Sequence, residues 1–308
     1  MRILRFGGVL AIGLFAGILA APSASDAGAP ASTAAPGYWL VGGDGGVFSF
    51  NAPFYGSGQA SGPDQGACGT FPPSPGACIG ISALGNGSGY WLVNTALWPQ
   101  AFGGADPSVS VKNCKTLNDG TTLDTGFVTG IASTGSGKGY WIVTRPGYVL
   151  GCGDAPLPLG ASTSVYIGDA VGIATTSDGK GYWVVGADGA VYVFGDANSY
   201  GSMVGRNLNA PVVGIAATAD GRGYWLVAAD GGVFAFGDAA FLGSMGDKDL
   251  NASMVGIAIA PDGHGYWLAA ADGGVFSFGN APFEGSMGGK HLAQSVTGIA
   301  TYAPPVSG

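Results

Sequence analysis

Apolar and turn-forming residues follow one another in a pattern that returns along the chain. The segment GYWLVAADGGVFAFGDA begins at residue 223 and has close copies before and after it. In an extended strand, Tyr224 and Leu226 point to one face and Trp225 and Val227 to the other, because successive side chains alternate. Both faces are apolar, which indicates a strand that is covered on both sides.

The spacing of this motif gives the size of the structural unit. The triplet Gly-Tyr-Trp begins at residues 37, 89, 139, 181, 223 and 265. The last three steps are each 42 residues, and a period of that length is typical of a propeller blade or a solenoid turn. Asp-Gly pairs separate short β-rich runs, and glycine supplies the positive φ that tight hairpins need. Each period therefore predicts three or four antiparallel strands.

The two ends of the repeat region carry complementary parts of one unit. The region opens on Gly-Tyr-Trp at 37 with no Val-x-Gly-Ile-Ala-like segment before it, and closes on such a segment at 295–301. Each kind of segment occurs six times. This offset predicts an all-β, six-bladed β-propeller whose N- and C-terminal strands pair to close the ring, leaving no exposed sheet edge. An open β-solenoid is the alternative.

The repeat resembles secreted β-propeller repeats of the broad WD-repeat, NHL and Asp-box type. It is most similar to the GYWLV-DGG-FAFGDA repeats of exported actinobacterial proteins, and the resemblance covers residues 37–301. TSDGKGYW and TADGRGYW look like the Asp-box pattern S/T-x-D-x-G-x-T-W, with Lys180 and Arg222 in place of its glycine and tyrosine in place of its threonine. The resemblance implies a β-hairpin element and no particular activity.

The first residues predict export. Arg2 and Arg5 precede an apolar run that is followed by small residues and prolines, the arrangement of a secretory signal. The run is shorter than the roughly 20 residues of a membrane-spanning helix. We therefore predict a signal peptide with a short linker at 1–31 and one six-repeat propeller domain at 32–308. The product would be secreted or associated with the cell wall, without membrane insertion.

Four cysteines follow the signal segment. An even number of cysteines outside the cytoplasm favours two disulfides, and four cysteines allow three pairings. We favour Cys68 with Cys78, which would close a short Pro/Gly-rich loop, and Cys114 with Cys152. The sequence has no Cys-x-x-Cys or Cys/His zinc spacing and no Asp-x-Asp-x-Asp ladder. We therefore expect no metal and no cofactor.

The charge balance limits the choice of partner. The chain has 11 Lys and Arg against 19 Asp and Glu, which gives a net charge of −8 at pH 7. Nucleic acid and anionic membranes need clustered basic residues, and those of this chain are scattered. We expect a monomer that binds a protein or a cell-wall glycan, and no nucleic acid.

Departures from the repeat consensus mark candidate ligand-binding residues. In the second repeat, ALWPQ replaces DGGVF and places Trp98 at a turn where other repeats have glycine. Arg206, Lys248 and Lys290 share one position of three successive repeats, so they would meet an anionic or sugar ligand on one side of the ring. His291 follows in the loop before the final strand. Loops on rigid scaffolds often bind ligands, and solvated loop cations are the alternative.

Catalytic patterns are sparse. Glu284 is the only glutamate, so a paired-carboxylate glycosidase would have to use aspartates, and most of these recur at turns that favour them. The chain has no G-x-S-x-G, H-E-x-x-H or P-loop motif. We predict an exported, non-catalytic binding or scaffolding module with no catalytic residue. The alternative is a carbohydrate-active hydrolase or lyase with an aspartate site on one propeller face, for which Asp247 and Asp249 are the nearest candidates.

Overall fold

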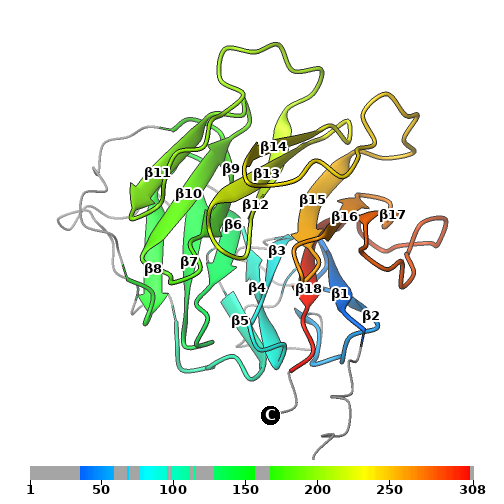
Figure 1. Cartoon of the computed structure of the whole chain (residues 1–308). Coiled ribbons are helices and arrows are strands. Elements are labelled where there is room, and N and C mark those ends of the chain that lie inside the picture. Colours follow the sequence, from blue (N-terminus) through cyan, green and yellow to red (C-terminus); the bar gives the residue numbers. More distant parts are fainter. Residues whose placement is uncertain are drawn as a thin grey trace, which may run out of the picture. The chain divides into compact units, whose positions relative to one another are not determined.

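The repeated motif folds into the same three-stranded antiparallel sheet in each of its six copies (Figure 1). The structure is a computed structural model that describes residues 35–58, 68, 77–95, 97, 99–110, 114, 128–156 and 167–305. Within these residues it is all β, with 18 strands and no α-helix. The predicted signal peptide at 1–31 lies outside the described residues.

Six sheets, named A to F, divide the strands between them. Sheet A has β18 (Val296–Tyr302), β1 (Gly37–Gly42) and β2 (Val47–Phe50), and sheet B has β3 (Cys78–Ala83), β4 (Gly89–Asn94) and β5 (Pro99–Gly103). Sheet C has β6 (Val128–Ser133), β7 (Gly139–Thr144) and β8 (Val149–Gly153), and sheet D has β9 (Ala170–Thr175), β10 (Gly181–Gly186) and β11 (Val191–Gly195). Sheet E has β12 (Val212–Ala217), β13 (Gly223–Ala228) and β14 (Val233–Gly237), and sheet F has β15 (Met254–Ile259), β16 (Gly265–Ala270) and β17 (Val275–Gly279).

The Gly-Tyr-Trp strand is the middle strand of every sheet. All six residues of each middle strand are buried, which confirms the prediction of a strand covered on both sides. The tyrosine and tryptophan of each copy are the largest fully buried side chains. Because both faces of the strand carry large apolar groups, each sheet needs a neighbour on either side.

Several of these tyrosine and tryptophan side chains also donate hydrogen bonds to backbone carbonyls in the loops that follow the sheets. In sheet D, Trp183 Nε1 donates to the carbonyl of Asn198 in the loop after β11, at 2.8 Å. In sheet E, the Tyr224 hydroxyl donates to Gly201 O, in the loop that follows sheet D, at 2.5 Å. Trp183 therefore holds a loop to its own sheet, whereas Tyr224 links sheet E to the loop that follows sheet D. Trp91 Nε1 and the Tyr140 hydroxyl make no such bond with any described residue.

The two ends of the repeat region pair with each other. Strand β18 runs antiparallel to β1, with Leu40 opposite Ile299, and the two lie side by side in Figure 1. The sequence offset predicts this pairing of terminal strands. One sheet is therefore built from the first and last strands of the described chain.

We call the strand that carries the Val-x-Gly-Ile-Ala-like segment the first strand of its sheet, which in sheet A is β18. The first strands of neighbouring sheets lie against one another. Each first strand contacts the next one in the order β3, β6, β9, β12, β15 and β18, and β18 contacts β3 again. A glycine occupies the third position of each first strand, and a methyl group added at Gly256 would lie 3.3 Å from Ile299 Cγ2. The absence of a side chain lets adjacent strands approach closely. Six three-stranded sheets in this arrangement are consistent with a six-bladed propeller.

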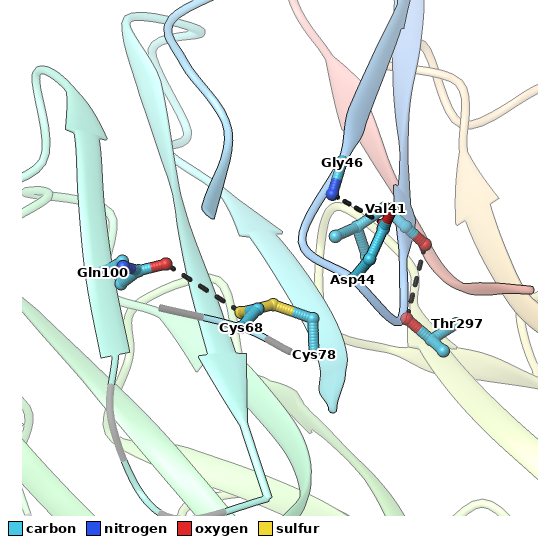
Figure 2. The surroundings of a disulfide bond; sticks show 7 residues. All are labelled: Val41, Asp44, Gly46, Cys68, Cys78, Gln100 and Thr297. Atoms are coloured by element: carbon cyan, nitrogen blue, oxygen red, sulfur yellow. Dashed lines mark hydrogen bonds between the residues drawn. A yellow bond between two sulfur atoms is a disulfide. The ribbon is translucent and has the colours of Figure 1, made fainter. Parts of the chain in front are cut away.

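Both cysteine pairs lie at disulfide distance, in the pairing that the sequence analysis favours. The Cα atoms are 5.0 Å apart for Cys68 and Cys78 and 4.0 Å apart for Cys114 and Cys152. Figure 2 shows the first pair, with the Gln100 side chain of β5 3.9 Å from the Cys68 sulfur. Such bonds are typical of proteins outside the cytoplasm. A bilayer-spanning helix is not found among the described residues.

Candidate functional site

The six first strands run in the same direction, so all of them begin at one face of the six-sheet assembly and end at the opposite face. At the face where they end, turns such as Thr176–Lys180 lead into the middle strands. A cavity of about 690 Å³ opens there, across sheets B to E, and we call it the hydroxyl pocket. Its volume lies in the range of small-molecule sites. The hydroxyl-bearing residues of its wall are Ser82, Ser133, Thr134, Ser136, Thr175, Thr176, Ser177 and Thr218.

An aliphatic wall continues the same opening. A second cavity of about 350 Å³ shares Ser82, Ala83 and Gly85 with the hydroxyl pocket and extends over sheets E, F and A. Its wall includes Ile257 and Ile259. The two cavities together take residues from all six sheets, so the opening has a hydroxyl-rich side and an aliphatic side.

The last residue of each first strand decides the character of the opening. These residues are Ala83, Ser133, Thr175, Ala217, Ile259 and Thr301, except that β18 runs one residue further. Ser133 Oγ donates to Ala83 O at 2.5 Å and Thr301 Oγ1 donates to Ile259 O at 2.7 Å, so these hydroxyls join neighbouring strands. The hydroxyl of Thr175 makes no hydrogen bond with any described residue, and neither does that of Ser177. Two hydroxyl groups of the pocket are therefore available to a ligand.

The carboxylates of the hydroxyl pocket are already engaged. Asp154 accepts hydrogen bonds from Thr134 Oγ1 at 2.9 Å and Ser136 Oγ at 2.5 Å. Asp178 accepts one from Lys180 Nζ at 2.9 Å and one from Thr176 Oγ1 at 2.9 Å. The hydrogen bonds from Lys180, followed by that from Thr176, hold the pKa of the Asp178 carboxyl well below its usual range. A carboxyl of lowered pKa is ionised at neutral pH and is a poor general acid.

Both aspartates belong to the repeat pattern. Asp178 is matched by Asp220 and Asp262, and Asp154 by Asp196 at the same place in the next repeat. Asp220 has the same hydrogen bonds, from Thr218 Oγ1 and from the side chain of its turn cation, and the pKa of its carboxyl is lowered to about 2. Aspartates that recur at the same turn in several repeats have a structural role, because short polar side chains of this kind stabilise tight turns.

The opposite face has an apolar cavity of about 470 Å³, which we call the bulge pocket. A register shift near the start of each first strand leaves one extra residue there, and such bulges re-aim side chains. These residues are Ile79, Thr129, Val171, Val213, Val255 and Thr297. All six line the bulge pocket. Arg145 stands at its edge with its Nε 3.7 Å from Asp169 Oδ1.

The cations proposed from the sequence occupy equivalent turns. Backbone N–H groups of Arg206, Lys248 and Lys290 donate to the methionine carbonyls three residues before them. All three side chains are exposed, none lines the hydroxyl pocket, and no described residue forms an ion pair with them. Lys290 and His291 line a cavity of about 520 Å³ together with Asp272. Ligand binding at these positions stays a prediction.

The remaining candidates lie away from the hydroxyl pocket. Trp98 is outside the described residues. Its neighbour Leu97, which is buried, takes the left-handed conformation with φ 64° at the turn where other repeats have glycine. Asp247 and Asp249 are exposed in the loop after sheet E and do not line the pocket.

Sequence reasoning missed the pocket residues themselves. The signal was present at the end of the Val-x-Gly-Ile-Ala-x segment, where the last residue is serine or threonine in some repeats and alanine or isoleucine in others. Thr175 and Ile259 are both such end residues. Their meeting at one opening depends on the order of the sheets in space.

Comparison with known proteins adds no family to this picture. No protein-family model matches the chain, and no curated protein matches it significantly.

Proposed function

We propose that the six sheets close into a six-bladed β-propeller of the GYWLV-DGG-FAFGDA repeat type. The pairing of β1 with β18 and the cyclic contacts of the first strands support this closure. The bulge pocket supports it too, because one cavity receives a residue from every first strand. An open solenoid would leave its first and last units apart.

The propeller acts as an exported, non-catalytic binding module for a cell-wall glycan. The observation that carries this proposal is the hydroxyl pocket, which combines unengaged hydroxyl groups with carboxylates held in turns. Ligand sites combine a shaped cavity with a few polar groups that fix orientation. The two disulfides stabilise the fold and are typical of proteins that function outside the cytoplasm. A protein partner is the other outcome that the test below would reveal.

The competing proposal, a carbohydrate-active hydrolase or lyase, finds less support. A glycosidase needs one carboxyl that stays protonated to act as the general acid and a second carboxylate nearby. The pocket holds Asp154 and Asp178 and no glutamate. Hydrogen bonds from Lys180 lower the pKa of Asp178, which is opposite to what a general acid requires.

The test is retention of the exported chain on insoluble wall polymers, with released sugar measured in the same mixtures. We expect the protein to be retained without release of reducing sugar. The double variant Asp154→Asn/Asp178→Asn separates the two proposals, because it should abolish release by a hydrolase that uses these carboxylates, whereas a binding module releases no sugar with or without them. Release that the double variant abolishes would overturn the proposal in favour of the enzyme. If no wall polymer retains the protein, a glycan is not the partner, and capture of an envelope protein becomes the measurement.

A further inference from the structure

We infer that the opening formed by the hydroxyl pocket and the adjoining aliphatic cavity takes a neutral pyranose, with the sugar hydroxyls against the Ser/Thr side and the C–H face of the ring against the aliphatic side. This inference rests on the proposed function and names its ligand class and binding site. It follows from the asymmetry of the opening, its unengaged hydroxyls and its charge.

The asymmetry matches an amphipathic ligand. Thr175 and Ser133 lie on one side of the opening, and Ile259 with Ile257 lies on the other. A pyranose presents hydroxyls around its edge and C–H groups on its faces. A purely apolar ligand would leave the hydroxyls of the pocket without partners, which is unfavourable.

Hydrogen-bonding capacity remains on the polar side. The Thr175 and Ser177 hydroxyls make no hydrogen bond to any described residue and can both donate and accept. Ser133 Oγ already donates to Ala83 O, so it offers acceptor capacity. Sugar hydroxyls both donate and accept, which matches this mixture of groups.

The charges favour a neutral ligand. Asp154 and Asp178 line the hydroxyl pocket, and Lys180 is the one cation among the described residues of its lining. Lys180 is paired with Asp178, whereas Asp154 forms no ion pair with any described residue. An anionic sugar would be repelled at short range. A carboxylated or sialylated sugar is therefore a poorer ligand than a neutral one.

The experiment measures binding of single sugars to the exported chain by calorimetry and by ligand-observed NMR. The probes are glucose, galactose, mannose and N-acetylglucosamine, with glucuronate and sialic acid as charged comparators. A monosaccharide that fills the site should bind with a Kd on the order of 1 mM. The anionic comparators should bind more weakly than every neutral sugar that binds.

Variants then place the sugar in the pocket. Thr175→Val keeps the shape of the side chain and Ser177→Ala removes one hydroxyl, and each should weaken binding roughly 2- to 10-fold, as expected for one lost hydrogen bond. Ile259→Thr, which introduces the residue that sheets D and A have at this position, should weaken it also. Thr129→Val in the bulge pocket is the matched control, because three other repeats have valine there. It should leave binding unchanged.

The outcomes separate this inference from the proposed function. Sugar binding that Thr175→Val, Ser177→Ala and Ile259→Thr all leave intact would overturn the pocket, while retention on wall polymers would leave the binding module standing. Tighter binding of the charged comparators would overturn the neutral class. Retention on wall polymers with no binding of any neutral sugar would also count against the inference alone. If the protein neither is retained on wall polymers nor binds any sugar, both the inference and the proposed function are overturned.

Discussion

Two tyrosines at the same position of different sheets should respond oppositely to loss of their hydroxyl group. Tyr224 donates to Gly201 O at 2.5 Å and accepts from Tyr200 N at 3.3 Å, across the boundary between sheets D and E. Tyr140, in sheet C, is fully buried, and its hydroxyl has no hydrogen-bond partner among the described residues. In other sheets the tyrosine donates to a glycine carbonyl in a segment of the FLGSM type. The corresponding segment for Tyr140 lies after β5, at residues 105–110, and reads ADPSVS.

The magnitudes follow from the hydrogen bonds. Tyr224→Phe should lower the free energy of unfolding by about 1 kcal/mol, the net value of one hydrogen bond, because Gly201 is exposed and its carbonyl can turn to water. Tyr140→Phe removes a buried hydroxyl that has no partner among the described residues, and it should raise the free energy of unfolding by about 1 kcal/mol. The difference between two conservative changes at one repeat position is then about 2 kcal/mol.

Urea denaturation of the exported chain measures this difference. With a slope of about 3 kcal/mol per molar urea, Tyr224→Phe should lower the midpoint by about 0.3 M and Tyr140→Phe should raise it by a similar amount. Tyr266→Phe is a matched control for Tyr224→Phe, because Tyr266 donates to Gly243 O at 2.5 Å in the same way. If Tyr140→Phe lowers the midpoint as much as the other two, its hydroxyl has a partner and the reasoning is refuted.

Three further predictions concern the stability of the fold. Burial raises the pKa of Tyr90 to about 12, so the unfolded chain loses this proton first as pH rises above about 10; stability should be complete below that pH and fall above it, and a step in tyrosinate absorbance from the buried tyrosines should coincide with unfolding. Replacing Cys114–Cys152 by serines should cost about 4 kcal/mol and replacing Cys68–Cys78 about 3, because the chain separations of 38 and 10 residues close loops of different length; an inverted order of thermal midpoints would contradict this ranking. Gly256→Val should cost about 1–3 kcal/mol by overpacking the neighbouring first strand, whereas Gly135→Ala, with nothing within 4 Å of an added methyl group, should cost nothing in the same urea assay.

The sheets and their terminal pairing were predictable because the signals are local and repeated. Alternating apolar residues around Trp225 mark a strand buried on both faces, and the Asp-Gly turns beside it mark its hairpins. The pairing of β1 with β18 followed from counting segments. The cysteine pairing was also predicted, since a bond between Cys68 and Cys78 spans only 10 positions. Each of these inferences uses neighbours in sequence or a complete count of repeats.

The hydroxyl pocket was not predictable in the same way. Its residues occupy the same position of different repeats, but they differ in residue type from one repeat to the next. A periodic cation such as Lys248 attracts notice in an alignment of the repeats, yet its equivalents sit on separate exposed loops and share no cavity with the pocket. Thr175 and Ile259 look like drift at one strand end until the sheets bring those ends to one opening. A repeat scaffold holds its middle strands constant, since every sheet must bury the same tyrosine and tryptophan. Chemical variety is therefore tolerated where the first strands end, and that is where the structure places the candidate site.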